Sequence, residues 1–244
     1  MTDAHCHVSC ADPTVRELLV GRDFFGVHPW ETLNGTTGTT GTTETSRALV
    51  PDIPVVPDVP SLPALLASLR AQLLANPGAG VGEIGLDRLK SRDISPRMHE
   101  IFEAQLALAL ELHRPVVLHG AKCWGQVVTA VKRMIGGGLA TSSGRQAFLF
   151  HGFSRSDGLI PEIVKLNGFI SVGPAILNDH AVNYRELVKK IPRDCLLVET
   201  DRTSSSGSPS ISDILAKTAD ILNLSFAELE RITDENADRF LGVV

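Results

Sequence analysis

The sequence places a carboxylate, Glu83, inside a short apolar stretch rich in glycine, residues 80–87. An unpartnered buried carboxylate would cost several kcal/mol, so it must reach solvent, pair with a cation or bind a metal ion. The nearby glycines, Gly82 and Gly85, allow another strand or a ligand to approach the backbone closely. We therefore expect Glu83 to belong to a functional site; the alternative is an acid at a sheet edge that faces water.

A second group of candidate ligands opens the chain, at residues 3–7 (DAHCH). On a strand, residues i and i+2 point to the same side, so His5 and His7 face together and Cys6 faces away. Such a pair suits a metal ion, although histidines also occur in strands for packing alone. His28, which precedes Pro29, either lines a site or caps a sheet.

Three more polar residues stand at the ends of separate apolar stretches: His119, His151 and Asp201. Parallel barrels and open α/β sheets place their chemistry at the carboxyl ends of their strands. Nitrogen and carboxylate ligands suit zinc, manganese or a similar divalent ion, and the lack of a cysteine cluster disfavours a structural zinc site. The complete candidate ligand set is His5, His7, Glu83, His119, His151 and Asp201.

The elements that must position these residues alternate between strands and helices, which is typical of a parallel sheet with crossover helices. Ser95 and Pro96 form an N-cap and first turn for a long helix that runs to about His113. Ser225 and Glu228 form a capping box for a closing helix that runs to Phe240. We also expect helices at 14–22 and 64–75, and strands at 24–30, 80–87, 115–120, 147–153, 168–173 and 196–201.

Composition limits the class of protein. With 244 residues, 43% hydrophobic and 21% charged, the chain can form one α/β domain over residues 1–244. A net charge of −5 argues against a nucleic-acid binder with a broad basic face, so any phosphate-bearing partner must be held locally. Four scattered cysteines, no leader pattern and no membrane-length apolar run predict a cytoplasmic protein with reduced thiols and no membrane contact.

Residues 34–63 differ in character from the rest of the chain. Gly-Thr-Thr repeats at 35–43 contain no apolar residue to bury, and prolines follow at every third position from 51 to 63. We expect a flexible, dispensable insert followed by an extended crossing. A tolerated insertion is favoured over a motif that binds a partner.

In its ordered motifs the chain resembles the TatD family of metal-dependent nucleases, a branch of the amidohydrolase-like TIM barrels. The resemblance spans nearly the whole chain. The complete series of motifs, in this order along the chain, is far more specific than any one motif. The matching stretches are residues 3–7 (DAHCH), 26–30 (GVHPW), 82–87 (GEIGLD), 115–119 (PVVLH), 151–154 (HGFS) and 199–201 (ETD), with Asn236 and residues 240–242 in the closing helix.

The resemblance implies a TIM-like (β/α) barrel that hydrolyses phosphodiester bonds in DNA with two divalent ions, of zinc, magnesium or manganese. Glu83 would bridge the ions, with His5, His7 and Asp201 on one and His119 and His151 on the other. Asp201 and Glu83 would be catalytic, Asp201 orienting or deprotonating a metal-activated water, with Glu199 as a supporting residue. A monomer is favoured.

Three departures from the family pattern concern the barrel and its rim. Only about 20 residues separate His7 from His28, so we count seven clear strands and expect a distorted barrel or one with a βα unit reduced near the N-terminus. Ala121 replaces the usual arginine, with Lys122 beside it, and Arg202 replaces the usual proline. We assign substrate binding to His28, Lys122 and Arg202, and expect a basic ring of Arg88, Lys90, Arg92, Lys122, Arg155 and Arg202.

Two other functions stay open. The same metal site would serve a hydrolase of another small ester, phosphoester or amide. A barrel without catalysis, which uses the Thr/Gly-rich insert to contact a partner, is disfavoured by the intact ligand set.

Overall fold

The computed structural model describes residues 1–33, 61–90, 92–136 and 146–243. Within these ranges the strands are β1 (Thr2–Cys6), β2 (Arg16–Leu19), β3 (Phe24–Phe25), β4 (Gly80–Asp87), β5 (Val116–Ala121), β6 (Phe148–Phe150), β7 (Gly168–Val172) and β8 (Leu196–Val198). The α-helices are α1 (Leu62–Ala75), α2 (Pro96–Glu111), α3 (Trp124–Met134), α4 (Ile160–Lys165), α5 (Val182–Lys190), α6 (Ile211–Leu222) and α7 (Phe226–Leu241). Short 3-10 helices are η1 (Glu31–Leu33), η3 (Asp157–Leu159), η4 (Pro174–Leu177) and η5 (Arg193–Cys195).

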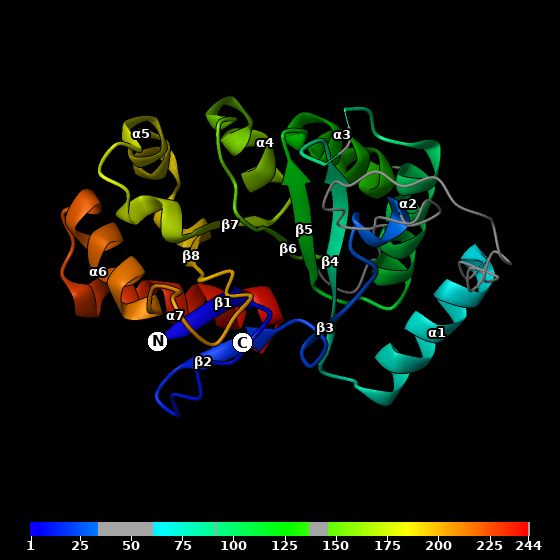
Figure 1. The fold of residues 1–244 in the computed structure, drawn as a ribbon, viewed down its shortest axis with the longest axis horizontal. Helices are drawn as coiled ribbons and strands as arrows, with labels where there is room; N and C mark the ends of the chain where they lie inside the picture. Colours follow the sequence, from blue (N-terminus) through cyan, green and yellow to red (C-terminus); the bar gives the residue numbers. More distant parts are fainter. Residues whose placement is uncertain (34–60, 91, 137–145, 244) are drawn as a thin grey trace, which may run out of the picture.

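All strands pair in parallel and follow the order of the chain. β3 to β8 form one sheet, and β1 and β2 form a second, two-stranded sheet. Asp201, beyond β8, donates its backbone N–H to the carbonyl of His5 at 3.0 Å, and a single bridge joins Val20 to Phe24 at the other seam. Helices α2 and α3 lie beside β4 and β5, with α1 outside α2; α5 and α6 lie at the opposite side, and α7 runs past β1 and β8 (Figure 1). The predicted TIM-like α/β barrel is confirmed.

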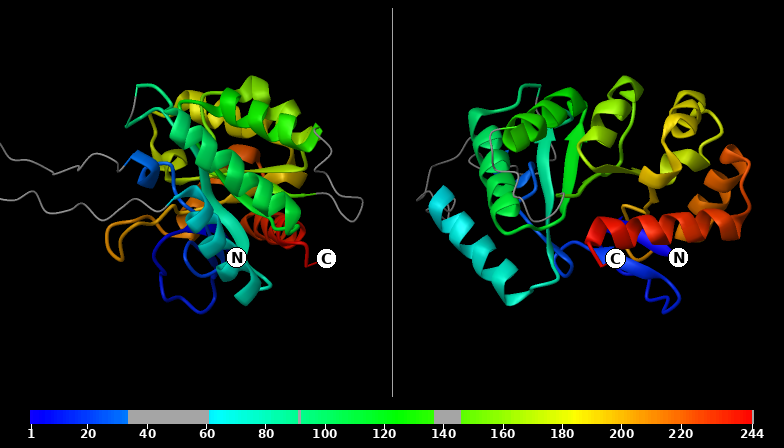
Figure 2. Two further views of the ribbon diagram at one scale, coloured as in Figure 1. Left: turned by 90° about the vertical axis from the view of Figure 1, so that its right-hand side faces the viewer. Right: turned by 180° about the vertical axis from the view of Figure 1, so that it is seen from behind.

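A row of inward-facing apolar residues fills the barrel. Ala4, Leu18, Phe24, Val117, Leu149, Phe169 and Leu197 form one buried cluster with Ala237 and Phe240 of α7. The Phe240 ring stacks on Phe24 and meets Phe169 edge-on, with ring centroids 5.8 Å apart in both pairs. These contacts lie near the amino-terminal ends of the strands. Figure 2 shows α7 running past β1, with both termini on the same side of the molecule. Helix α7 therefore closes the end of the barrel opposite the carboxyl ends of the strands.

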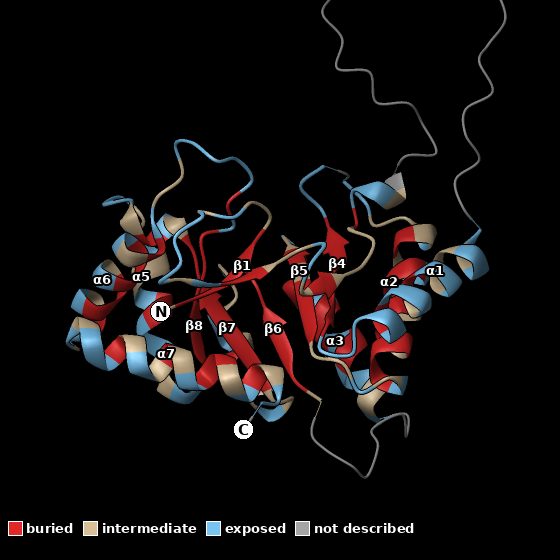
Figure 3. Ribbon diagram, turned by 90° about the horizontal axis from the view of Figure 1, so that it is seen from below, coloured by how far each residue is buried: buried red, intermediate tan, exposed pale blue. Residues whose placement is uncertain are grey.

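The next inward-facing position after these apolar residues carries a polar side chain on three of the strands. Residues two apart on a strand face the same side. His119 follows Val117 by two positions, His151 follows Leu149, and Glu199 follows Leu197. The same inward face that forms the core thus carries the candidate site at the carboxyl ends of the strands. Figure 3 shows the strands, coloured as buried, surrounded by helices with exposed outer faces.

Two glycines of β4 allow β5 to approach closely. A Cβ added at Gly85, where φ is +154°, would lie 2.0 Å from the carbonyl oxygen of His119. A Cβ at Gly82 would lie 2.7 Å from the Cβ of Val117. These glycines bring the backbone that carries Glu83 against the strand that carries His119.

The predicted helix at 14–22 is wrong, because Arg16–Leu19 forms strand β2 beside β1. A short apolar segment does not distinguish strand from helix, and pairing with β1 decides here. The predicted strand at 24–30 is shorter, Phe24–Phe25. Our count of seven strands is also corrected: the described residues contain eight, and no helix follows β1 or β2 within residues 7–23. The link between β2 and β3, residues 20–23, is too short to hold a crossover helix, and an isolated bridge of Val20 to Phe24 joins the two sheets there.

The long helix with its Ser95 cap is confirmed, since the Ser95 hydroxyl accepts the Met98 N–H at 3.0 Å. Helix α1 begins at Leu62, two residues earlier than predicted. The insert predicted at 34–63 lies outside the described residues up to position 60. None of the described helices has the length and apolar character required to cross a membrane.

Candidate metal centre

The buried carboxylate of Glu83 divides its two oxygens between two groups of histidines. Oε2 lies 3.2 Å from Nε2 of His5 and 3.4 Å from Nε2 of His7. Oε1 lies 2.6 Å from Nε2 of His151 and contacts Nδ1 of His119. The side chain of Glu83 is 3% exposed, so solvent does not stabilise its charge. Glu83 therefore lies between two groups of imidazole nitrogens.

Asp201 completes the first set. Its Oδ1 lies 3.8 Å from Nε2 of His5 and 3.6 Å from Nε2 of His7. The backbone of Asp201 has φ +47°, a left-handed conformation that aspartate adopts more readily than most residues. Its side chain is 46% exposed, and it therefore offers a carboxylate to both the cluster and solvent.

The spacing of the first group fits a divalent cation. Two ligand atoms on one tetrahedral ion, each about 2.0–2.1 Å from it, lie about 3.3 Å apart. The contacts of His5 and His7 with Glu83 and Asp201, at 3.2 to 3.8 Å, are close to that separation. The set of imidazoles and carboxylates is also one that zinc and manganese accept.

The charges in the cluster also favour a bound cation. Burial alone would raise the pKa of Glu83, but the adjacent His151, His119 and His28 hold it well below its usual value. The oxygens of Asp201 and Glu83 raise the pKa of His7 to about 9. The carboxylates thus attract positive charge, and a divalent ion would compete with protons for these ligands.

His28, assigned to substrate from the sequence, lies inside the cluster. Its Nε2 is 3.4 Å from Oε1 of Glu83, and its ring centroid is 4.7 Å from that of His119. His28, Glu83 and His119 also present their ligand atoms within 4.8 Å of one another. His28 is therefore placed to touch an ion as well as a substrate.

Sequence reasoning missed Asp87 as a site residue. Its buried Oδ2 accepts hydrogen bonds from Nε2 of His119 at 2.9 Å and from the indole N–H of Trp30 at 2.8 Å. Asp87 fixes the orientation of the His119 ring and directs Nδ1 towards Glu83. The available signal was its spacing: residues 83, 85 and 87 face the same side of a regular strand.

Glu199 holds the end of β6. Its Oε1 accepts the Gly152 N–H at 2.7 Å, and its Oε2 accepts the Ser171 hydroxyl at 2.6 Å. The same Oε1 lies 3.4 Å from Nδ1 of His151. Glu199 is thus behind the His151 ring, opposite the Nε2 atom that faces Glu83.

The basic residues divide between the cavity and other positions. Lys122 and Arg155 are exposed and line a cavity of about 800 Å³ together with His119, His151 and Asp201. Arg88 lines a neighbouring cavity of about 500 Å³ that shares Lys122 with the first. These positions allow contact with an anionic substrate.

Arg202, in contrast, does not reach the cavity. Its side chain is 7% exposed, and its Nη1 lies 3.5 Å from Oε1 of Glu17. The substrate contact predicted for Arg202 gains no support from this geometry, because the guanidinium is buried beside Glu17. Its backbone carbonyl instead accepts the amide hydrogens of His7 and Val8 at 2.9 and 3.1 Å.

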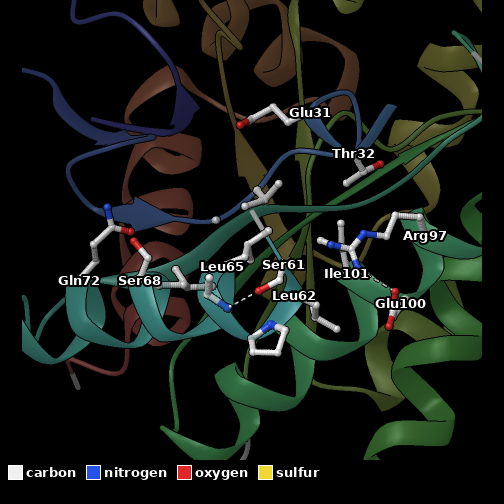
Figure 4. A pocket seen from close by; sticks show the side chains of 15 residues that line it. Glu31, Thr32, Ser61, Leu62, Leu65, Ser68, Gln72, Arg97, Glu100 and Ile101 are labelled. Atoms are coloured by element: carbon white, nitrogen blue, oxygen red, sulfur yellow. Dashed lines mark hydrogen bonds and ion pairs between the residues drawn. The ribbon is translucent and has the colours of Figure 1, made fainter. Parts of the chain in front are cut away.

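A further cavity of about 860 Å³ lies between η1, α1 and α2 (Figure 4). Its apolar surface comes from Leu62, Leu65, Leu69 and Ile101. At its edge, Nη1 of Arg97 donates to Oε2 of Glu100 at 2.9 Å. None of the clustered histidines and carboxylates lines it, so it is separate from the metal centre.

The parallel barrel carries a candidate metal centre, the cluster of histidines and carboxylates, at the carboxyl ends of its strands. The chain belongs to the TatD-related DNase family, whose sequence model matches residues 21–242. His5 and His7 precede the matched range, so their place in the site rests on the geometry above.

Individual relatives agree with this family. The chain is 29% identical over 174 residues to an uncharacterized metal-dependent hydrolase, YabD, of Bacillus subtilis, which covers 67% of this chain and 65% of that protein. It is 27% identical over 177 residues to the 3′-5′ ssDNA/RNA exonuclease TatD of Klebsiella pneumoniae, with the same coverages of 67% and 65%. The matches thus span less than two thirds of either relative.

Solved structures share the fold. The crystal structure of the TatD homologue YjjV from Escherichia coli superposes with a TM-score of 0.61 at 25% identity and covers 74% of this chain and 71% of that one. A TatD-family hydrolase from Entamoeba histolytica gives a TM-score of 0.64 at 16% identity, with coverages of 93% and 75%.

Proposed function

We propose that this chain is a divalent-metal-dependent hydrolase of phosphodiester bonds, acting as a TatD-type deoxyribonuclease or exonuclease in a single domain. The division of the two Glu83 oxygens between two histidine groups carries this proposal. His5, His7 and Asp201 would hold one ion, His119 and His151 the other, and Glu83 both. Zinc, magnesium and manganese are the candidates; cytoplasmic location and a monomeric state stay predictions from the sequence.

The chemistry of such a site divides between ions and side chains. Bound divalent ions lower the pKa of water and neutralise charge that develops on phosphoryl oxygens. The exposed carboxylate of Asp201 would orient the attacking water and accept its proton. Lys122 and Arg155, at the cavity wall, are placed to contact substrate phosphates. Asp87 and Glu199 would keep the rings of His119 and His151 oriented for metal binding.

The name of the Klebsiella relative, a 3′-5′ exonuclease of single-stranded DNA and RNA, supports a nucleic-acid substrate here. The test is an assay of the metal-loaded protein on single-stranded DNA labelled at the 3′ or 5′ end. We expect progressive shortening from one end, lost on chelation of the metal. A protein that holds its metal but leaves every labelled strand intact would contradict the nuclease proposal.

Burial of Arg202 favours a second candidate, hydrolysis of another small ester, phosphoester or amide. It leaves Lys122 and Arg155 as the cations among the described residues that line the cavity with the metal ligands. Two cations suit a small anion as well as a strand. A substrate panel of phosphomonoesters, phosphodiesters, carboxylic esters and amides separates this candidate from the nuclease.

A further inference from the structure

Trp30 presents a large aromatic ring to solvent beside the metal centre. Its side chain is 40% exposed, whereas Trp124, the other tryptophan of the chain, is 5% exposed. The Trp30 ring centroid lies 4.8 Å from that of His28 and 6.3 Å from that of His119. The exposed ring is thus a direct neighbour of two residues that face Glu83.

A hydrogen bond fixes this ring. The indole N–H of Trp30 donates to Oδ2 of Asp87 at 2.8 Å, and Asp87 is fully buried. The same oxygen holds His119 at 2.9 Å. One carboxylate therefore sets the position of Trp30 relative to the His119 ring. A ring fixed in this way loses little conformational entropy when a flat ligand stacks on it.

The same carboxylate also fixes the backbone of Lys90, whose ammonium group lies over the Trp30 ring. Oδ1 of Asp87 accepts the backbone N–H groups of Leu89 at 2.6 Å and Lys90 at 3.1 Å. Nζ of Lys90 lies 3.5 Å from the centroid of the Trp30 ring. Leu89 is 58% exposed and lines the 800 Å³ cavity that contains His119. An exposed aromatic ring, an apolar side chain and a lysine thus lie together at one rim of the site.

Proteins that bind single-stranded nucleic acid combine these features. Bases stack on aromatic side chains, and nearby cations follow the phosphates. We propose that Trp30 stacks a nucleobase of a single-stranded substrate and that Lys90 binds an adjacent phosphate. This inference rests on the proposed nuclease function and assigns one wall of its substrate site.

Lys90 lies over the ring face and must move aside when a base stacks. An exposed cation–π contact is weaker than the stacking of one base on an aromatic side chain. The lysine also gains a phosphate partner in exchange, and its flexible chain allows the movement. The exchange is therefore favourable for a ligand that carries both a base and a phosphate.

Intrinsic fluorescence tests this directly. The probe is a single-stranded deoxyoligonucleotide with hydrolysis-resistant phosphorothioate linkages, compared with an abasic oligomer of equal length and charge, in the metal-containing assay buffer. We expect the base-containing oligomer to quench tryptophan emission and the abasic one to leave it unchanged. Trp30→Phe should abolish most of the quenching, because the remaining Trp124, although it lines the cavity, is only 5% exposed and packs against Phe150 and Phe153.

Binding of the two oligomers to substituted proteins separates stacking from a structural role. Trp30→Phe, which keeps a ring but loses the N–H donor, should stay within about threefold of the wild-type Kd for the base-containing oligomer. Trp30→Leu, which lacks a ring, should weaken it about tenfold. Neither change should affect the abasic oligomer. Lys90→Gln should reduce the salt dependence of binding, whereas Lys132→Gln, the same charge change on α3, should not.

Different results would contradict the stacking proposal and the nuclease proposal. Equal affinity for the two oligomers, or cleavage of single-stranded DNA without any change in Trp30 emission, would show that the indole only covers Asp87. In that case the nuclease function stands and stacking fails. A wild-type protein that neither binds nor cleaves the base-containing oligomer would overturn both proposals.

Discussion

The guanidinium of Arg202 lies 3.5 Å from the carboxylate of Glu17. The backbone carbonyl of Arg202 accepts the amide hydrogens of His7 and Val8. Arg202 directly follows Asp201, whose own amide donates to the carbonyl of His5. Glu17 on β2 is thus connected through one arginine to the loops that carry two of the candidate ligands. The pair thus ties the two-stranded sheet of β1 and β2 to the loop that follows β8.

Breaking this pair should loosen the first ligand set. Glu17→Gln or Arg202→Met removes one partner of a buried, charge-assisted contact, so we expect about 1–3 kcal/mol lower free energy of unfolding. Displacement of His7 and Asp201 should also weaken metal binding at that set about tenfold. Denaturant titration and a Co²⁺ absorption titration measure the two effects. Arg70→Gln, which breaks an exposed pair with Glu111, is the control and should leave metal affinity unchanged.

Asp87→Asn should act on the second ligand set. All four groups around the Asp87 carboxylate, His119, Trp30 and the amides of Leu89 and Lys90, are hydrogen-bond donors. An asparagine NH₂ would oppose some of these donors, so the His119 ring should lose its fixed orientation. We expect a 10- to 100-fold loss of affinity for the ion at His119. Calorimetric metal titration should show this loss in one binding step; equal weakening of both steps would contradict the assignment.

Gly85→Ala should separate the two strands that carry Glu83 and His119. The added Cβ would lie 2.0 Å from the His119 carbonyl oxygen, and φ at this position is +154°. Both effects oppose folding, so we expect a loss above about 2 kcal/mol in free energy of unfolding. Gly125→Ala is a matched control, because nothing lies within 4 Å of its added Cβ and α3 favours alanine there. If the two variants melted together, the close approach of β4 and β5 would be wrong.

Much of the fold was predictable because strands β5 to β8 are each followed or closed by a distinct polar residue or glycine. Apolar runs that stop at His119, His151 or a glycine give both the strand and its direction, and Ser95 marks the start of α2. The six candidate ligands come together because strand periodicity and parallel order already place them on one edge. No tertiary information was needed for that step.

What the sequence did not reveal depends on contacts between distant segments. Residues 16–19 form a strand only because β1 offers them a partner. Arg202 looked like a rim cation because its buried partner, Glu17, is 185 residues earlier in the chain. Asp87 was overlooked because its role depends on Trp30 and His119, which arrive from other elements. Side-chain pairing across the barrel is not encoded in local pattern.

Glu83→Gln tests the centre of the site. Glutamine keeps the size of the side chain but loses the negative charge that lies between the two histidine groups. Two divalent ions about 3.5–4 Å apart repel strongly unless an anionic bridge separates them. We expect the variant to retain one equivalent of metal or less and to lose hydrolysis. His151→Ala should remove the ion at the second set and spare the one held by His5, His7 and Asp201.

Metal analysis and melting curves decide between a bridge and a simple strand-end acid. Metal at 100 times its Kd should stabilise the wild-type protein by about 2.7 kcal/mol, which raises Tm by about 5–10 °C for a chain of this size. Without metal, wild type and Glu83→Gln should both melt cooperatively, since glutamine fills the same space. With metal, the gain in Tm should be largely lost in the variant. A Glu83→Gln protein that still held two ions and showed the full gain would prove that the two histidine groups bind metal without Glu83.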